Sequence, residues 1–475
     1  MFHGTPIISS FPASARITCL RSGRAFGSGR LAAAVDARAA GLAGQGLRRG
    51  DAVVVAESDG ADFLIGVFAC WAAGLCAVAV SPDLKAEERA RVAESTGARA
   101  WLGRDAPELP PPAGGPGQAS GPLGLDEPAL ILLTSGTTGV PKGVTHTLRG
   151  LSARLALNRA AIGDHALRRT LCVLPVFFGH GLIGNCLTAL SAGAALTLWP
   201  RPSVAELGGF GDLIDSEAIS FFSSVPTFWK IALRVSSRPA AAPERVHVGS
   251  APLGIGTWRE IAGWTGTRNI YNMFGMTETA NWTGGGALDE ADGRDGYVGR
   301  AWGGHFAVLC DGGVHADGTG EVLVSSPSVM RGFWGQPEKT REAFHGAWFR
   351  SGDIGTLAAD GSLVLKGRIK SEINRGGLKV LPEEIDMLLE RHRDVAEACA
   401  FAIPDPVAGE AVAAAVVLAP GARLGEGALK AWCAERVRAE AVPQRLFFVP
   451  ALPRNDRGKI VRRAVRDAVF TAGGG

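Results

Sequence analysis

Residues 132–144 read Leu-Leu-Thr-Ser-Gly-Thr-Thr-Gly-Val-Pro-Lys-Gly-Val, and they carry more information than any other stretch of the chain. They overlap an apolar run, residues 129–133, which predicts a strand. The segment 134–139 combines four hydroxyl side chains with two glycines, and Lys142 follows it. Free backbone N–H groups, hydroxyl donors and a mobile cation are suited to binding phosphate. A proline precedes the lysine and a glycine follows it, so the stretch is not a Walker A loop.

The composition is that of a globular protein. The chain has 475 residues, of which 46% are hydrophobic and 20% charged, and this length predicts two or more domains. The 49 basic and 46 acidic residues nearly balance, which disfavours a nucleic-acid partner or a polybasic membrane anchor. The eight cysteines are scattered without a CxxC pair. They predict reduced core residues of a cytoplasmic protein rather than disulfides or a zinc site.

One segment, Phe63–Val80, has the length of a transmembrane helix, with 18 uncharged residues. Gly74 divides it into a buried helix over 62–73 and a strand over 76–80. The N-terminus lacks the basic and apolar regions of a signal peptide. We therefore expect no membrane partner.

The chain changes texture along its length. Residues 28–104 alternate between helix-like and strand-like pieces, a pattern typical of a parallel sheet covered by helices. Short strand-like pieces dominate from about residue 297 to residue 365. The pairs Asp317–Gly318 and Asp360–Gly361 predict hairpin turns there, so this part indicates a β-rich subdomain.

A mixed helix and strand pattern follows the β-rich part. We therefore expect an α/β fold with a large N-terminal domain over residues 1–368, made of helix-covered mixed or parallel sheets plus the β-rich subdomain. A small, mobile α+β C-terminal domain is expected over residues 369–475.

Five further motifs follow the phosphate loop in the chain. They are Val248–Leu253, Tyr271–Thr279, Phe349–Gly355, Lys366–Lys370 and Pro453–Arg463. Their wording and order resemble the acyl-adenylate-forming enzymes, which comprise acyl- and aryl-CoA ligases, adenylation domains and luciferases. The resemblance implies an ATP-dependent enzyme that converts a small carboxylic acid to acyl-AMP with release of pyrophosphate, and then to a thioester.

The resemblance also assigns a nucleotide site. It implies that Phe274 stacks on adenine, Asn272 reads the adenine edge, Asp353 binds the ribose hydroxyls and Arg368 contacts the ribose or a phosphate. Ionised aspartate only accepts hydrogen bonds, which suits two hydroxyls. The other nucleotide-binding residues implied are Ser250, Ala251, Pro252, Met273 and Gly275. The phosphate loop comprises Thr134, Ser135, Gly136, Thr137, Thr138, Gly139 and Lys142.

Three residues are assigned to catalysis by the same resemblance. Thr277 would contact the α-phosphate, Glu278 would bind Mg²⁺ and Lys459 would be the catalytic lysine of adenylation. A carboxylate suits Mg²⁺, because this hard cation prefers oxygen ligands. A fixed cation would stabilise the charge that grows as the acid attacks the α-phosphate. A non-catalytic nucleotide-binding protein is the alternative, and the intact motifs disfavour it.

The acyl pocket should follow Pro175. The resemblance places Phe178, Gly179 and His180 there, with Trp282 as a wall. No acidic side chain is present to hold an ammonium group, which disfavours an α-amino acid. The pattern is similar to benzoate-type aryl-CoA ligases and implies an aryl or cyclic acid. A medium-chain fatty acid is the alternative.

The second half-reaction needs a thiol. The resemblance makes Lys370 a hinge between the domains and places Gly376 and Gly377 at the thiol tunnel. The chain ends 12 residues after Arg463 without a carrier domain. The expected acceptor is therefore free CoA, or the phosphopantetheine of a separate carrier protein.

Overall fold

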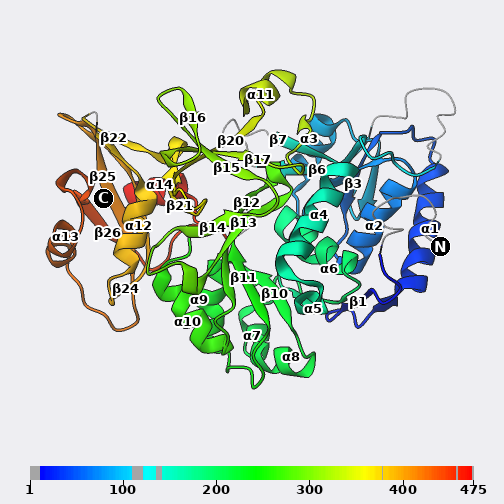
Figure 1. Cartoon of the computed structure of the whole chain (residues 1–475), viewed down its shortest axis with the longest axis horizontal. Helices are drawn as coiled ribbons and strands as arrows, with labels where there is room; N and C mark the ends of the chain where they lie inside the picture. Colours follow the sequence, from blue (N-terminus) through cyan, green and yellow to red (C-terminus); the bar gives the residue numbers. More distant parts are fainter. Residues whose placement is uncertain (1–10, 110–120, 135–141, 377, 456–457, 473–475) are drawn as a thin grey trace.

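The computed structural model describes residues 11–109, 121–134, 142–376, 378–455 and 458–472. Residues 135–139 of the predicted phosphate loop and Gly377 lie outside this part. Three sheets occur in the described residues, and helices cover them (Figure 1). The predicted α/β class is confirmed.

The first sheet has six strands in the described residues and the order β18-β7-β6-β4-β3-β5. These strands are β3 (Ala52–Ala56), β4 (Cys76–Ala79), β5 (Ala100–Gly103), β6 (Pro128–Thr134), β7 (Lys142–Thr147) and β18 (Gly332–Phe333). Strands β3 to β6 are parallel, and the apolar runs of β3 and β4 are buried on both faces. The helices before and between them are α1 (Ser28–Ala43), α2 (Gly60–Ala72) and α3 (Ala86–Thr96).

The predicted division of Phe63–Val80 is confirmed. Helix α2 ends at Ala72, Gly74 adopts a φ of 76°, and β4 begins at Cys76. Within the described residues, no helix is both long enough and apolar enough to cross a bilayer.

The second sheet has 15 strands in the described residues. Its parallel part contains β1 (Arg16–Cys19), β9 (Ala195–Leu198), β8 (Arg169–Cys172), β10 (Phe221–Ser224), β11 (Arg245–Gly249) and β12 (Ile270–Met276). Strand β2 (Ala25–Gly27) forms one edge. Helices α4 (Leu148–Ile162), α5 (Asp164–Leu167), α6 (Thr188–Ser191), α7 (Val204–Leu207), α8 (Phe210–Ser216), α9 (Pro226–Val235) and α10 (Ile255–Thr265), with the π-helix η1 (His180–Leu187), connect these strands.

An antiparallel extension continues this sheet beyond β12. Its strands are β13 (Asn281–Ala287), β14 (Tyr297–Ala301), β21 (Leu363–Arg368), β20 (Trp348–Leu357), β17 (Gly318–Ser325), β15 (His305–Cys310) and β16 (Gly313–His315), with β19 (Phe344–His345) on β20. The short helices η2 (Thr277–Thr279), η3 (Leu288–Glu290) and α11 (Pro337–Glu342) interrupt it. This is the predicted β-rich part.

One of the two predicted hairpin turns is wrong. Asp360–Gly361 joins the paired strands β20 and β21, as expected. Asp317–Gly318 joins β16 to β17, which are separated by β15 in the sheet. The hairpin turn lies at Asp311–Gly312 instead, between β15 and β16, where φ is 50° and 77°. Tight hairpins favour positive φ at both central residues, and only this pair provides it.

The C-terminal region, residues 369–472, has its own sheet, with five strands in the residues that the structure describes. Its strands are β22 (Ile373–Arg375), β23 (Leu378–Val380), β24 (Val395–Asp405), β25 (Gly409–Leu418) and β26 (Arg445–Phe448). Helices α12 (Pro382–Glu390), α13 (Glu426–Ala434) and α14 (Arg462–Ala472) complete it, with the short helices η4 (Ile369–Ser371) and η5 (Ala439–Ala441). Its two apolar clusters are separate from the main core. A domain boundary at residue 368 stays a prediction.

The C-terminal region packs against α9 and the segment before β14 (Figure 1). Lys230 on α9 forms an ion pair with Glu390 at the end of α12, with 2.7 Å between Nζ and Oε1. Arg391 donates through Nε to Asp295 Oδ2 at 2.6 Å. These polar contacts fix the orientation in which the C-terminal region meets the rest of the chain.

Candidate active site

The predicted site residues gather where the parallel strands β10, β11 and β12 end, at Ser224, Gly249 and Met276. The carboxyl ends of parallel strands form one edge of a sheet, and ligands of α/β proteins bind there. The β6–β7 hairpin and the loop around Lys459 converge on the same edge. Residues far apart in the sequence therefore meet at one place.

The turn η2 carries Thr277 and Glu278 and is held through its backbone. His146 on β7 donates from Nε2 to the Thr277 carbonyl at 2.8 Å, and burial lowers the pKa of this histidine to about 4, which keeps it neutral. The Met330 amide donates to the Glu278 carbonyl at 2.7 Å. The hairpin that leads into the phosphate loop thus positions the turn directly.

Asp353 and Arg368 face each other across the β20–β21 ladder, and Arg368 Nε donates to Asp353 Oδ1 at 2.7 Å. Burial raises the pKa of Asp353, and the charge of Arg368 opposes that shift. Burial also raises the pKa of Glu278, against the charges of Arg368 and Lys142. Four separate motifs therefore contribute to one electrostatic cluster, which comprises Lys142, Glu278, Asp353 and Arg368.

The two ends of the phosphate loop are placed. Thr134 and Lys142 are register partners at the open end of the β6–β7 hairpin. Lys142 Nζ lies 5.2 Å from the centroid of the Phe333 ring, and its charge reaches Glu278. The loop between them therefore starts and ends beside the Thr–Glu turn.

Lys459 belongs to this cluster although it comes from the C-terminal region. Its charge acts to lower the pKa of Asp353, against the effect of burial, and also the pKa of His180, so it is within electrostatic range of both. Its backbone amide donates to Asn455 Oδ1 at 3.0 Å, which fixes the loop. A Cβ on the neighbouring Gly458 would lie 3.4 Å from Thr227 Oγ1 on α9.

Of the two residues predicted for the thiol tunnel, only Gly376 is described, and it makes its contacts away from this cluster. The exposed Gly376 forms a turn with φ of 60°, and its amide donates to the Ala408 carbonyl at 2.8 Å. Arg375 donates to the Glu440 carbonyl at 2.8 Å. The β22–β23 hairpin thus packs on its own region, while Lys370 lies exposed in η4.

His180 begins the π-helix η1 and is bonded on both ring nitrogens. Nδ1 lies 2.8 Å from Ser250 Oγ, and Nε2 lies 2.6 Å from Ser223 Oγ. Burial lowers the pKa of His180 to about 3, with help from Lys459. The ring is therefore neutral, with one nitrogen donating and the other accepting.

Trp282 is the wall predicted for the acyl pocket, and it is 2% exposed. Its ring centroid lies 5.4 Å from that of His180 and 4.7 Å from that of His247. A Cβ on Gly184 of η1 would lie 3.0 Å from Trp282 Cζ2 and would clash with Asn281. Glycine at this position therefore lets the indole fit beneath the π-helix.

The remaining pocket residues lie just before η1. Phe178 is half-buried, with its ring centroid 4.5 Å from that of Phe177. A Cβ on Gly179 would lie 3.2 Å from Leu132 Cδ1 in the strand that leads to the phosphate loop. The acyl and phosphate parts of the site are therefore adjacent.

The residues assigned to the nucleotide on β12 divide between two faces of the strand. Phe274 is 5% exposed and its ring centroid lies 5.7 Å from that of Phe306. Asn272 is 3% exposed and donates to the Tyr297 carbonyl at 2.8 Å, so its amide group is already engaged. Met273 faces the other way and packs with Trp282. Its side chain packs beside the predicted acyl pocket, and its assignment to the nucleotide stays a prediction.

The other nucleotide residues lie in tight backbone. Gly275 has the Asn281 carbonyl where a Cβ would be, at a bulge in the β12–β13 pairing. Ser250 has a φ of 68° and bonds His180, so it links the nucleotide motif to the acyl pocket. Ala251 is half-buried and Pro252 is exposed in the same loop.

Sequence reasoning missed three residues of the pocket: Ser223, Arg245 and His247. Ser223 and His247 are register partners on β10 and β11, and Arg245 lies two residues before His247. Alternate residues of a strand face the same side. The signal was the alternation of polar and apolar residues along β11, which no short motif displays, whereas β10 reads Phe-Phe-Ser-Ser and does not alternate.

The donor set suits magnesium held together with nucleotide phosphates. The described residues contain no cluster of three or more metal-ligating side chains. Mg²⁺ is often held by one or two carboxylates plus substrate phosphates. Glu278 is the carboxylate next to the phosphate loop and would hold the ion there.

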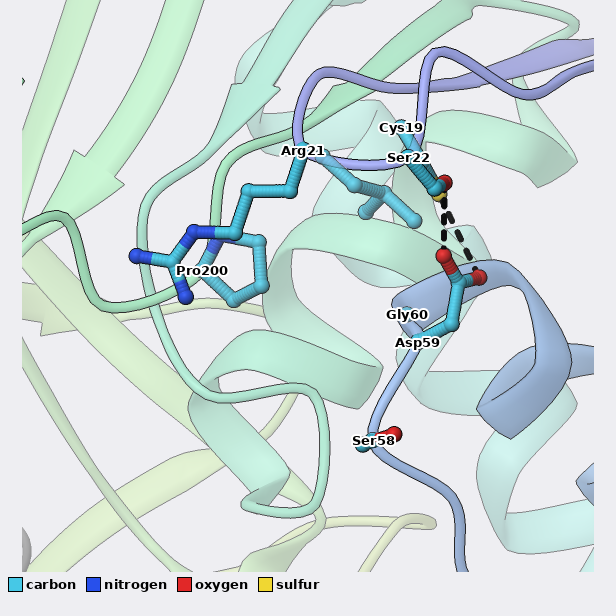
Figure 2. A pocket seen from close by; sticks show the side chains of 8 residues that line it. Cys19, Arg21, Ser22, Ser58, Asp59, Gly60 and Pro200 are labelled. Atoms are coloured by element: carbon cyan, nitrogen blue, oxygen red, sulfur yellow. Dashed lines mark hydrogen bonds between the residues drawn. The ribbon is translucent and has the colours of Figure 1, made fainter.

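A cavity of about 230 Å³ lies apart from these residues, at the start of α2 (Figure 2). Asp59 caps α2 by accepting from the Ala61 amide at 2.9 Å, and it accepts from Ser22 Oγ at 2.7 Å. Its carboxylate is thus used by the fold, and the lining includes none of the predicted site residues.

Comparison with known proteins agrees with this geometry. The family described as AMP-binding enzyme matches residues 13–334, and the family described as AMP-binding enzyme C-terminal domain matches residues 384–459. The chain belongs to the AMP-binding enzymes. Feruloyl-CoA synthase of an Amycolatopsis species is 30% identical over 94% of each chain.

Other relatives share the family and the fold. Oxalate–CoA ligase of Arabidopsis thaliana is 34% identical over 72% of this chain and 67% of its own length. The crystal structure of ATP-bound MatB from Rhodopseudomonas palustris is 25% identical, covers 96% of both chains and has a TM-score of 0.83. The AMP complex of o-succinylbenzoate coenzyme A synthetase from Bacillus subtilis has a TM-score of 0.84 at 24% identity, covering 97% of this chain and 98% of that one.

Family membership and these relatives establish the reaction class. This AMP-binding enzyme is an AMP-forming acid–thiol ligase. It activates a carboxylic acid as acyl-AMP and then forms a thioester. The prediction of an acyl-adenylate-forming enzyme is confirmed.

Proposed function

We propose that the enzyme activates a compact aryl or cyclic acid whose acyl part carries no charge. The aromatic side chains that pack next to His180 support this proposal. The rings of His180, Trp282, His247 and Phe221 form a chain of contacts from η1 to β10, with centroid distances from 4.7 to 5.4 Å. This row of aromatic rings suits a flat, ring-shaped acyl group and leaves little room for a long acyl chain.

The charge state of the pocket supports an uncharged acyl part. His180 is neutral and is bonded by two serines. Arg245 lies behind His247, where its guanidinium stacks 3.7 Å from the centroid of the Tyr271 ring. A buried ammonium group would have no carboxylate partner in this pocket, so an amino acid would bind poorly.

The roles of the nucleotide residues follow from their positions. The phosphate loop, between Thr134 and Lys142, would hold the β- and γ-phosphates. Glu278 would hold Mg²⁺ and Asp353 would bind the ribose. Lys459, whose charge acts on both Asp353 and His180, would stabilise the charge that develops on the α-phosphate as the acid attacks.

The second half-reaction requires a different orientation of the C-terminal region. The structure has Lys459 at the site and the Gly376 hairpin packed away from it. We propose a rotation about Lys370 that exchanges the two, in a cytoplasmic protein with domains over 1–368 and 369–475. A carrier protein in place of free CoA is the alternative acceptor.

The test is ATP–pyrophosphate exchange with a panel of acids. We expect exchange with single-ring aryl and alicyclic acids and little with amino acids or long fatty acids. Exchange that is fastest with long-chain acids would contradict a compact pocket. Thioester formation from the preferred acid with free CoA, compared with a phosphopantetheinylated carrier, would identify the acceptor.

A further inference from the structure

Arg245 and His247 form a buried pair on β11, directly behind Trp282. Arg245 donates from Nε to His247 Nε2 at 2.9 Å. A guanidinium has no lone pair, so His247 Nε2 must be the acceptor. The neutral ring then carries its proton on Nδ1. Arg245 also donates to the Ala161 carbonyl at 2.9 Å, which anchors it to α4.

Two N–H groups in this place have nothing to donate to. His247 Nδ1 and Trp282 Nε1 are buried and have no hydrogen-bond partner among the residues that the structure describes. Their side chains are 0% and 2% exposed, and the two ring centroids are 4.7 Å apart. Buried donors without a partner are rare in native proteins, and each one calls for an explanation.

Among the residues that the structure describes, no carboxylate or other acceptor bonds these two N–H groups. Phe221, Tyr271 and Trp302 pack around the His247 ring, with centroids 4.9, 5.7 and 5.6 Å away. The nearest charged group is the Arg245 guanidinium, which makes the floor electropositive. The group that completes the pocket should therefore bring an acceptor and no donor.

This reasoning rests on the proposed function, in which the acid's ring lies against Trp282. We propose that His247 and Trp282 determine specificity by donating hydrogen bonds to an acceptor atom at the far end of the acid. The substrate class is then a ring acid with an oxygen or nitrogen acceptor remote from the reacting carboxylate. Arg245 acts as a positioning residue that fixes the tautomer of His247.

Two pairs of isosteric acids test this directly. Tetrahydropyran-4-carboxylate differs from cyclohexanecarboxylate by a ring oxygen, and isonicotinate differs from benzoate by a ring nitrogen. Neither replacement adds a donor at neutral pH. Because a buried donor left unpaired is costly, we expect kcat/KM for pyrophosphate exchange to favour the acceptor acid in at least one pair by about 10- to 100-fold.

Variants assign the preference to the two donors. His247→Phe and Trp282→Phe each remove one N–H, and each should reduce the ratio within the pair, chiefly by improving use of the carbocyclic acid. Trp302→Phe is the matched control, because it makes the same change in a half-buried ring that touches His247. The control should keep the ratio.

The outcomes separate this inference from the function beneath it. Exchange at equal rates within both pairs would overturn the inference and leave the proposed acid class intact. Exchange with none of the four acids would overturn both. A preference that survives in both His247→Phe and Trp282→Phe would overturn the assignment to these donors.

Discussion

The predicted nucleotide site and the predicted acyl pocket are adjacent, but burial shifts the pKa values of their buried groups in opposite directions. In the nucleotide site burial raises the pKa of the carboxyl groups of Asp353 and Glu278. In the acyl pocket burial lowers the pKa of His180 and His247. Burial disfavours the charged form in each case. The carboxyl groups interact with cations, whereas the imidazoles stay neutral and use their ring nitrogens for hydrogen bonds.

The cations around Asp353 and Glu278 show how the first region is completed. Arg368, Lys142 and Lys459 favour ionised carboxylates there, and Mg²⁺ would add to them. The acyl pocket has no such compensation, since Arg245 faces a histidine. We therefore expect changes of charge to affect the reaction with ATP, and changes of shape or hydrogen bonding to affect which acid is used.

The largest effect is expected for Lys459→Ala. Loss of one transition-state contact typically costs about 10²- to 10³-fold in rate, so acyl-AMP formation should fall by that amount. Thioester formation from supplied acyl-AMP should be largely spared. Rapid-quench assays of the two half-reactions measure this, with Lys430→Ala on α13 as the control. Equal loss of both half-reactions would refute the assignment.

Asp353→Asn should raise KM for ATP by about 10- to 100-fold, because hydrogen bonds to charged groups are the stronger ones. Selectivity among acids should not change, since the residue lies on the nucleotide side. Initial rates with ATP varied at saturating acid give the value. An unchanged KM would mean that Asp353 serves only to pair with Arg368.

Trp282→Ala tests the other region. Removing the indole should admit acids longer or bulkier than one ring, shifting kcat/KM between a long and a compact acid by about 10- to 100-fold. KM for ATP should change little. The same variant should lose about 3 to 5 kcal/mol of stability, as a large ring leaves the core. Loss of stability without a shift in acid preference would place Trp282 outside the pocket.

The sequence predicted the two regions unequally, for a physical reason. The phosphate and ribose contacts are predicted from short runs of neighbouring residues, namely the turn with Thr277 and Glu278 and the part of β20 that contains Asp353, so they form readable motifs. The acyl pocket uses every second residue of separate strands. Ser223 and His247 are partners only through the register of β10 and β11, which a single sequence does not display.

One error has the same origin. The Asp317–Gly318 turn was predicted from its dipeptide, but β15 lies between β16 and β17 in the sheet. Strand order depends on non-local pairing, which a dipeptide does not contain.

Buried neutral histidines predict a pH effect on stability. Burial lowers the pKa of His146 to about 4 and holds that of His247 well below its usual value, so the native protein does not take up these protons when the unfolded chain does. Stability is therefore retained above an unfolded pKa of about 6.5 and lost as the pH falls below it. Each histidine should cost about 1.4 kcal/mol between about pH 7.5 and about pH 5.5.

Urea unfolding at the two pH values measures this loss. Replacing His146 with Gln should remove one histidine's share of the pH dependence. The raised pKa values of Asp353 and Glu278 act in the opposite sense, since their native forms take up protons first as the pH falls. If the free energy of unfolding changes equally with pH in the His146 variant and in the wild type, His146 is not a neutral, buried histidine.

The smallest effect concerns the ion pair that orients the C-terminal region. Lys230 on α9 and Glu390 on α12 form an ion pair at 2.7 Å, and their side chains are 20% and 29% exposed. We expect this contact to help hold the C-terminal region in the orientation that presents Lys459 to the nucleotide site. Lys230→Met should slow acyl-AMP formation by up to about five-fold, since partly exposed pairs contribute about 1 kcal/mol or less. It should not slow thioester formation, which requires the other orientation.

Arg159→Met is the matched control, because it breaks the Arg159–Asp164 pair within the N-terminal region. The ratio of the two half-reaction rates should therefore fall for Lys230→Met and stay constant for Arg159→Met. Because the ion pair weakens as salt screens it, the difference should shrink at high ionic strength. Equal slowing of both half-reactions would show that Lys230 supports the fold of α9 rather than the orientation that serves the nucleotide site.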